Sequence, residues 1–364
     1  MTSLIPAKVL LRAADIPVIS ERERVFISEL EKLAAHKETA TTREVLADLD
    51  EEMYGKLAAN IPKDIADRVH VFPYESNRRL RMSQLIQPLR SPTTESADFR
   101  DLTGQIYRLL FEYVFDERYH REPGVPMGVD TRVNEPTQQR SVQLVPRMSD
   151  VEKPVLAVFM RAGLYPALVL GKEFERATGQ VPEYALFRIR RDGHKGREAL
   201  KYVLDYEFNG EAMRGRDVYI PEPMLATAGS LLAVHQHVTR AGITPKSLTL
   251  LGTIGAYEGT VLAARHIPGL EVYLAWMDPL LNKKGYILPG LGDAGDLLNG
   301  QTEELGLLLR SYSAEFCKVH EKQIESLYHA MGSHAPKELF QDLDYAISRV
   351  EATALKPHTR HSDL

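Results

Sequence analysis

The spacing of apolar residues changes along the chain near residue 154. Before that point, apolar residues recur at helical intervals among many charges, first in Ser20–Ala35 and again in Arg43–Leu57, and this spacing predicts two amphipathic helices. A third helix is expected in ADFRDLTGQIYRLLFEYVF, after the polar loop LRSPTTES. Residues 121–150 are rich in Pro, Gly, Arg and Asn, which is typical of an irregular connection or a hairpin.

Beyond residue 154, short apolar runs alternate with helical stretches such as YPALVLGKEFERA and SLLAVHQHVTRAG. This alternation predicts βαβ units around a buried parallel sheet, and therefore an α/β fold. The five expected strands are 155–160, 184–189, 217–222, 247–255 and 271–277. Two more helices are expected within 302–352, followed by a frayed tail.

Charge and cysteine content narrow the class of protein. The 364 residues carry 45 basic and 50 acidic side chains, a net charge of −5, whereas a general nucleic-acid binder carries a strong basic excess. Cys317 is the single cysteine, so no intrachain disulfide can form, and we expect this residue to pack in a helix. The N-terminus lacks a signal-peptide pattern, and no run approaches about 18 apolar residues. We therefore expect a cytoplasmic protein that binds neither nucleic acid nor membrane.

The sequence DVYIPEPMLATAGSLLAVHQHV places a loop of small residues between an apolar strand and a helix. Small side chains let backbone N–H groups approach a phosphate closely, and the N-terminus of the helix adds the positive end of its dipole. Thr227 and Ser230 can donate from their hydroxyls, and Glu222 could bind sugar hydroxyls or a metal. A phosphate cradle is the favoured interpretation. A tight strand-to-helix turn, packed with small residues, is the alternative.

A second loop, KKGYILPGLGDAGDLLNG (283–300), combines five glycines with Asp293 and Asp296. So many glycines indicate unusual backbone conformations, and such a loop can present its own N–H and C=O groups to a small planar ligand. A structural Ω-loop is an equal alternative on the pattern alone.

Two basic segments could also meet an anion. MRAGLYPAL (160–168) puts Arg161 between a strand and a helix. The segment 188–206 is basic around a glycine-rich centre, and it is either a mobile loop that closes over a polyanion or a solvated hairpin. Its basic residues are Arg188, Arg190, Arg191, Lys195, Arg197 and Lys201.

No metal site stands out elsewhere in the sequence. His235 and His237 lie two residues apart on an expected helix, so they should point to different faces. Trp276 and Met277 are expected in the core. Asp278 follows them at the carboxyl edge of the sheet, where ligands bind in such folds.

Together these segments resemble the uracil phosphoribosyltransferase family. The family patterns RAG, RD, DPMLATGGS and GYIVPGLGDAGDR are echoed here, and LRSPTTESADFR is similar to the family's LRD..T....FR segment. The resemblance covers about 80–301. It implies a type I phosphoribosyltransferase fold, a doubly wound parallel sheet with a hood, at 78–301 between helical extensions at 1–77 and 302–364. The implied reaction converts uracil and phosphoribosyl pyrophosphate (PRPP), with Mg²⁺, into UMP and pyrophosphate.

The resemblance also implies roles for individual residues. Arg161, Arg191 and Asp293 would be catalytic, because the two arginines would hold the pyrophosphate and Asp293 would face PRPP. Tyr286 would stack on a base, or else pack in the core. The residues that would cradle the ribose 5-phosphate are Glu222, Pro223, Met224, Leu225, Ala226, Thr227, Ala228, Gly229 and Ser230. Those that would read the base edge are Ile287, Gly292, Asp293 and Ala294.

Four positions depart from the family pattern. Glu222 stands where the family has Asp, Ala228 replaces a glycine, Leu297 replaces an arginine, and the family's lysine near Asp205 has no counterpart. An alanine is strained wherever φ must be positive. Two alternatives therefore stay open: a homologue that uses another nucleobase-like acceptor in a specialised pathway, and a PRPP- or nucleotide-binding regulatory protein with weak activity. The likeness also suggests a homo-oligomer, such as a dimer.

Overall fold

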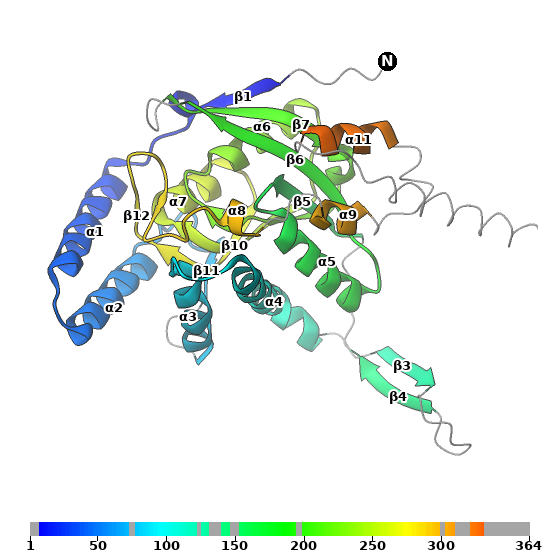
Figure 1. The fold of residues 1–364 in the computed structure, drawn as a ribbon, viewed down its shortest axis with the longest axis horizontal. Coiled ribbons are helices and arrows are strands. Elements are labelled where there is room, and N and C mark those ends of the chain that lie inside the picture. Colours follow the sequence, from blue (N-terminus) through cyan, green and yellow to red (C-terminus); the bar gives the residue numbers. More distant parts are fainter. Residues whose placement is uncertain are drawn as a thin grey trace, which may run out of the picture. The chain divides into compact units, whose positions relative to one another are not determined.

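The computed structural model describes residues 7–72, 77–121, 125–130, 140–145, 153–193, 199–298, 303–309 and 321–330. These residues fall into two compact units, one within residues 7–299 and the other within residues 300–364. Figure 1 shows the elements in chain order.

The core of the larger unit is one sheet whose central strands run parallel. Its order is β1-β7-β6-β5-β8-β10-β11-β2, and the short β9 (Met224–Leu225) pairs with β10. All residues of β5 and β8 are buried, because helices cover both faces of the sheet. The five strands predicted from the sequence are confirmed as β5 (Val155–Met160), β6 (Glu183–Asp192), β8 (Asp217–Pro221), β10 (Ser247–Ala256) and β11 (Leu270–Asp278).

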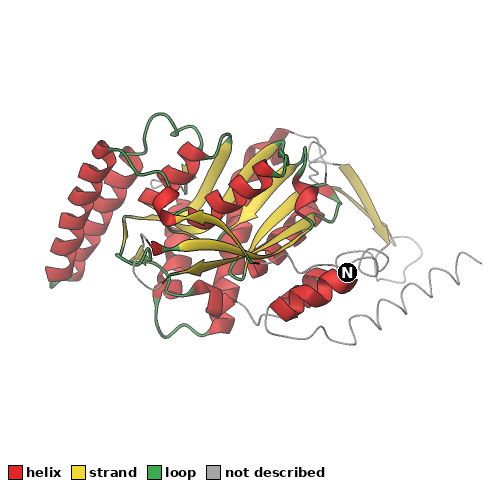
Figure 2. Cartoon of the chain, turned by 90° about the horizontal axis from the view of Figure 1, so that it is seen from above, coloured by secondary structure: helices red, strands yellow, loops and turns green. Residues whose placement is uncertain are grey.

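Helices pack on the two faces of this sheet, as Figures 1 and 2 show. On one face, the rings of Phe115 and Phe174 lie 5.6 and 4.6 Å from that of Tyr219 in β8. On the other face, Val218 and Ile220 join a buried cluster with the remaining helices. The first face is covered by α3 (Asn77–Arg90), α4 (Ser96–Arg121) and α5 (Leu164–Thr178), and the second by α6 (Gly229–Arg240) and α7 (Tyr257–His266). The predicted doubly wound α/β fold is therefore confirmed.

The N-terminal region contributes strands as well as helices. The two predicted helices are present as α1 (Glu21–Thr39) and α2 (Arg43–Ala59). Strands β1 (Lys8–Arg12) and β2 (Val69–Val71) lie at the two edges of the sheet, and β7 (Lys201–Phe208) pairs antiparallel with both β1 and β6. The sequence pattern did not predict β1 and β2, because strands this short show no clear period of their own.

Smaller elements complete the described structure. A two-stranded hairpin at 125–145 agrees with one of the two expectations for this segment. Two helices, α9 and α11, are described within 302–352, where two helices were expected. These elements are η1 (Ala13–Asp15), β3 (Val125–Asp130), β4 (Arg140–Val145), η3 (Gly210–Met213), β12 (Leu280–Leu281), β13 (Ile287–Leu288), α8 (Ala294–Leu298), α9 (Glu303–Leu309) and α11 (Glu321–Ala330).

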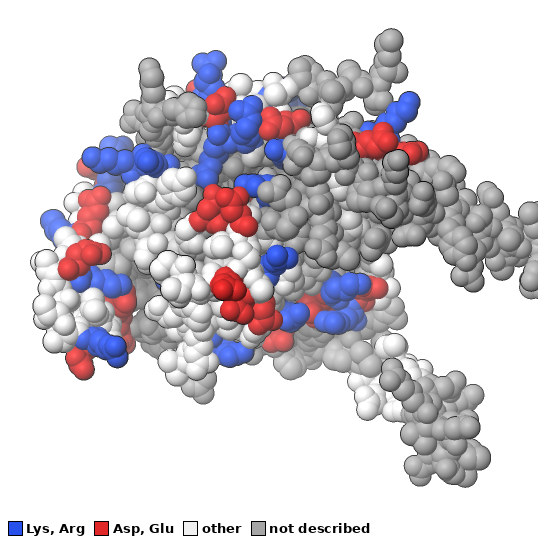
Figure 3. All heavy atoms as spheres, in the orientation of Figure 1, with Lys and Arg blue, Asp and Glu red and all other residues white. Residues whose placement is uncertain are grey.

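Among the described helices, none is both long and apolar enough to cross a membrane. Acidic and basic side chains are interspersed on the face seen in Figure 3, and neither sign forms a single large patch there.

Candidate active site

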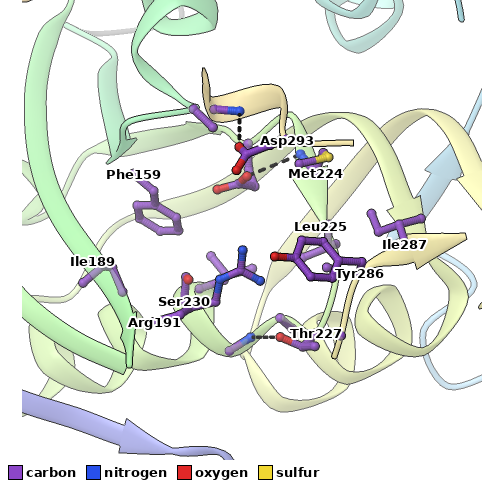
Figure 4. A pocket seen from close by; sticks show the side chains of 18 of the residues that line it. Phe159, Ile189, Arg191, Met224, Leu225, Thr227, Ser230, Tyr286, Ile287 and Asp293 are labelled. Atoms are coloured by element: carbon purple, nitrogen blue, oxygen red, sulfur yellow. Dashed lines mark hydrogen bonds between the residues drawn. The ribbon is translucent and has the colours of Figure 1, made fainter. Parts of the chain in front are cut away.

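A cavity of about 600 Å³ opens at the carboxyl edge of the parallel strands. Its walls come from the turn after β5, the end of β6, the loop between β8 and α6, and the glycine-rich loop at 285–295. Ligands bind at this edge in open parallel sheets, because the turns from strand to helix meet there. Figure 4 shows side chains from these segments around the same space.

The loop after β8 forms a backbone turn at the start of α6. Ala228 is the N-cap of α6 and has φ 61° and ψ −1°. This alanine, which replaces a glycine of the family pattern, therefore does adopt a positive φ. A Cβ at Gly229 would lie 1.9 Å from the ring of Tyr202, so only glycine fits there. Gly229, Ser230 and Leu231 line the cavity at the end of α6 where helix N–H groups lack intrahelical partners. This geometry suits an anion.

Thr227 uses its hydroxyl within the protein. Its Oγ1 lies 2.8 Å from the Tyr202 hydroxyl and accepts a hydrogen bond from the Gly229 N–H at 3.4 Å. Thr227 and Tyr202 are both buried. The hydroxyl of Thr227 therefore shapes the turn, and it can still donate to a ligand when the Tyr202 hydroxyl is the donor of the bond between them.

Glu222 begins this loop and lines the cavity. Its Oε1 accepts a hydrogen bond from the Met224 N–H at 3.3 Å. The glutamate side chain, which is longer than the aspartate of the family pattern, therefore folds back on its own loop. Burial raises the pKa of Glu222 to about 7, although the bond from Met224 and the charge of Arg191 lower it. Near neutral pH the carboxyl is therefore divided between the neutral form, which can donate to a ligand hydroxyl, and the ionised form, which can only accept.

A buried ion pair anchors the glycine-rich loop. Arg90, at the end of α3, donates hydrogen bonds of 2.7 and 2.9 Å to Asp278, at the end of β11. Arg90 also donates to the Gly290 carbonyl at 2.9 Å, and the Gly290 N–H donates to Asp278 at 3.0 Å. The side chain of Asp278 is 1% exposed. Asp278 thus lies at the carboxyl edge, as expected, but it holds the loop and does not line the cavity.

Arg191 and Tyr286 point toward one another from opposite walls (Figure 4). The Arg191 guanidinium carbon lies 5.8 Å from the centre of the Tyr286 ring, within the range of a cation–π contact. Tyr286 is 45% exposed, which is inconsistent with the core-packing alternative. The side chain of Asn282 accepts a hydrogen bond from the Tyr286 N–H at 3.0 Å and fixes the turn that carries the ring. The ring is therefore accessible to a planar ligand.

The turn after β5 meets the glycine-rich loop through charged side chains. Arg161 forms an ion pair with Asp296 of α8 at 2.6 Å. Asp293 accepts hydrogen bonds from the N–H groups of Gly295 and Asp296 at 3.1 and 3.3 Å, while its side chain lines the cavity. An anion that binds Arg161 must therefore compete with Asp296.

The structure brings most of the predicted site residues to this cavity. Pro223 and Ala294 are buried and do not line it, whereas every other predicted substrate or catalytic residue does. Leu297 is also outside the lining. Sequence reasoning missed Phe159 and Tyr202, which look like ordinary strand residues in their local sequence.

Other residues singled out in the sequence lie elsewhere. His235 lines a small apolar cavity behind α6, and His237 pairs with Glu207 at 2.6 Å, so the two histidines do face different surroundings. Lys195, Arg197 and Cys317 lie outside the described residues.

The cavity lining offers two carboxylates that could bind a metal ion together with a substrate. Within the described ranges, no group of three or more His, Cys, Asp or Glu side chains could hold an ion. Glu222 and Asp293 are the carboxylates in the lining. This donor set fits Mg²⁺, which keeps several waters and binds through one or two carboxylates together with substrate phosphates.

A parallel α/β sheet whose carboxyl edge joins an anion cradle to a glycine-rich loop defines an enzyme of the type I phosphoribosyltransferase class. The family model for uracil phosphoribosyltransferase matches residues 78–300, and the chain belongs to that family. The uracil phosphoribosyltransferase of Clostridioides difficile is 31% identical over 212 residues, which are 58% of this chain and 90% of the relative. That of a Nocardioides species is 33% identical over 217 residues, 58% of this chain and 91% of the relative. A solved structure from Aquifex aeolicus covers 63% of this chain and 97% of its own, at 22% identity and a TM-score of 0.47.

Proposed function

We propose that this enzyme transfers the phosphoribosyl group of PRPP to uracil and forms UMP and pyrophosphate. The observation that carries the proposal is the single cavity that joins the helix-terminal cradle of α6 to the glycine-rich loop. A volume of about 600 Å³ is typical of a small-molecule site. The names of the relatives, which are uracil phosphoribosyltransferases, support this choice of acceptor.

The donor would span the cavity from the N-terminus of α6 to Arg161 and Arg191. Its 5-phosphate would accept hydrogen bonds from the N–H groups of Ser230 and Leu231, where the helix dipole favours negative charge. Its pyrophosphate would lie near Arg161 and Arg191, which stabilise the charge that develops as this group leaves. Because Arg161 is paired with Asp296, donor binding would exchange that carboxylate for a phosphate oxygen.

The reaction needs little acid–base work from side chains. Displacement at the anomeric carbon passes through an oxocarbenium-like state, which nearby negative charge stabilises. Glu222 would contact the ribose hydroxyls, and Asp293 would face the donor from the glycine-rich loop. When bound with the donor, Mg²⁺ would neutralise charge on the leaving pyrophosphate.

The acceptor would bind at the glycine-rich loop. Tyr286 offers an exposed ring for stacking, and the backbone near Ile287 and Gly292 offers donors and acceptors to the edge of a planar base. The buried contact between Arg90 and Asp278 would keep this backbone template in register.

A different acceptor is the second candidate, and a weakly active regulator that binds PRPP is the third. Ala228 holds a positive φ that costs an alanine about 1 kcal/mol, and Glu222 turns back onto its own loop. Both changes lie in the cradle for the donor and not in the loop for the acceptor, so they favour the third candidate over the second.

A coupled assay separates these candidates. The purified full chain would receive PRPP, Mg²⁺ and one of a panel of nucleobases, and pyrophosphate release would be followed. Release with uracil supports the proposal, and release with another base alone selects the second candidate. Binding of PRPP without turnover selects the regulator.

We further propose that the enzyme is a cytoplasmic homo-oligomer. The β3–β4 hairpin supports self-association, since Met127, Val129, Val142 and Leu144 are all between 51% and 71% exposed. Exposed apolar side chains on both faces of a hairpin favour a protein partner. Light scattering should give a mass above that of one chain, and Leu144→Asp should lower it. A monomeric wild-type chain would contradict this proposal.

A further inference from the structure

Arg188 of β6 is a cavity-lining cation that lacks a full set of partners. Its side chain is 27% exposed, and its Nε lies 3.9 Å from Oδ2 of Asp205, too far for a hydrogen bond. Its Nη1 is buried and has no hydrogen-bond partner among the described residues. A buried N–H group of a charged side chain without an acceptor is costly, so a ligand that supplies one gains affinity.

The acidic side chain nearest to Arg188 is already engaged. Both carboxylate oxygens of Asp205 accept hydrogen bonds from Arg190, at 3.3 and 3.4 Å. Arg190 also pairs with Asp192 at 3.3 Å. Asp205 therefore binds Arg190 more closely than it binds Arg188.

Two other cations of the cavity have partners of their own. Arg161 is paired with Asp296, and Arg191 lies over the ring of Tyr286. Arg188 stands out among them because one of its buried nitrogens is unsatisfied.

The surroundings of Arg188 favour an anion. Burial lowers the pKa of Arg188, and the positive charges of Arg161 and Arg190 lower it further, although Asp205 raises it. In the sheet, Arg188 is paired with Met160, the residue directly before Arg161. Arg188 and Arg161 therefore flank the same end of the cavity, the end where the pyrophosphate of the donor is proposed to bind.

We propose that Arg188 is a further substrate-binding residue, whose Nη1 donates to an oxygen of the diphosphate group of the donor. The choice of this ligand rests on the proposed function. Arg188 would be a third arginine on the diphosphate side, beside Arg161 and Arg191. It lies within β6. Asp205 then acts as a competing carboxylate that limits how strongly Arg188 binds the ligand.

The test is calorimetric titration of the full chain with inorganic pyrophosphate in the presence of Mg²⁺ and without any nucleobase. Arg188→Gln should weaken binding by about tenfold or more, the usual loss for a hydrogen bond between charged groups. Asp205→Asn should act in the opposite direction and tighten binding, by roughly two- to fivefold. Opposite signs at two neighbouring positions are not expected from general damage to the fold.

Arg216→Gln is the matched control. Arg216 is 32% exposed and pairs with Glu183 at 2.6 Å, so its exposure and charge resemble those of Arg188. It lies directly before β8, at the amino edge of the sheet, away from the cavity. Binding of pyrophosphate by this variant should stay within about twofold of the wild type, because a charge beyond the Debye length is largely screened.

Three results would contradict the proposed role of Arg188. Unchanged binding by Arg188→Gln, weaker binding by Asp205→Asn, or no pyrophosphate binding by the wild type would each overturn it. If Arg188→Gln fails to fold, Asp205→Asn alone decides by its sign. The titration contains no acceptor, so a chain that rejects uracil but shows these effects refutes the proposed acceptor and leaves the role of Arg188 intact.

Discussion

Replacing Arg90 by methionine should remove the anchor of the glycine-rich loop. The change deletes two hydrogen bonds to Asp278, at 2.7 and 2.9 Å, and one to the Gly290 carbonyl. It also leaves a carboxylate with 1% exposure without its counter-ion. Breaking a buried ion pair on one side costs about 3–5 kcal/mol, a large part of the roughly 5–15 kcal/mol that stabilises a typical domain.

The functional effect should be confined to the acceptor side. Gly290 belongs to the loop proposed to read the base, whereas the cradle at α6 makes no contact with Arg90 in the described hydrogen bonds. We expect the KM for the nucleobase to rise by about tenfold or more, the cost of misplacing a loop that carries one or two ligand hydrogen bonds, while the KM for PRPP changes little.

Urea denaturation and steady-state kinetics measure the two effects. Arg68→Met is the control, because among the described residues Arg68 donates to the backbone carbonyls of Ala264 and Leu270 and to no carboxylate. A second substitution, Asp278→Asn, should recover part of the stability lost in Arg90→Met, because it removes the buried charge. Equal stability of Arg90→Met and the wild type, or a rise in the PRPP KM alone, would refute the assigned role of this ion pair.

Three further outcomes are expected. Gly229→Ala should destabilise the fold by about 1–3 kcal/mol and abolish PRPP binding, because its Cβ would lie 1.9 Å from the ring of Tyr202. The control is Gly55→Ala, which should be neutral or stabilising in the same thermal melt, because no atom lies within 4 Å of the added Cβ. Because the folded-state pKa of Glu222 is raised from 4.5 to about 7, stability should fall as pH rises through this window, and Glu222→Gln should flatten that part of a urea-melt pH profile; an unchanged profile would argue against the raised pKa. Asp293→Asn should remove most turnover although asparagine can still cap α8, and His235→Ala should leave turnover nearly unchanged; the reverse ranking would contradict the site assignment.

The sheet could be predicted because its strands are buried on both faces. The run Val155–Met160 has no polar face, and the loops that follow such strands are short, so both strand and turn leave a local signal. The small residues before α6 are equally local. The positive φ of Ala228 could be considered only through the resemblance, because the family has a glycine at this position.

Contacts between distant segments could not be predicted in this way. Arg90 and Asp278 are 188 residues apart, and nothing near either residue indicates its partner. The isolation of Arg188 is also a property of the fold, because it depends on Arg190 engaging Asp205 across the β6–β7 pair. Local sequence reports propensity and burial, whereas the pairing of buried charges follows only from the assembled structure.

The products of the reaction show which group the enzyme transfers and to which base. The full chain should be incubated with PRPP, Mg²⁺ and uracil, and both UMP and pyrophosphate should be quantified by chromatography. UMP and pyrophosphate should appear in equal amounts, and neither should form without uracil. Pyrophosphate without UMP, or no pyrophosphate under conditions in which PRPP is shown to bind, would contradict the proposed function.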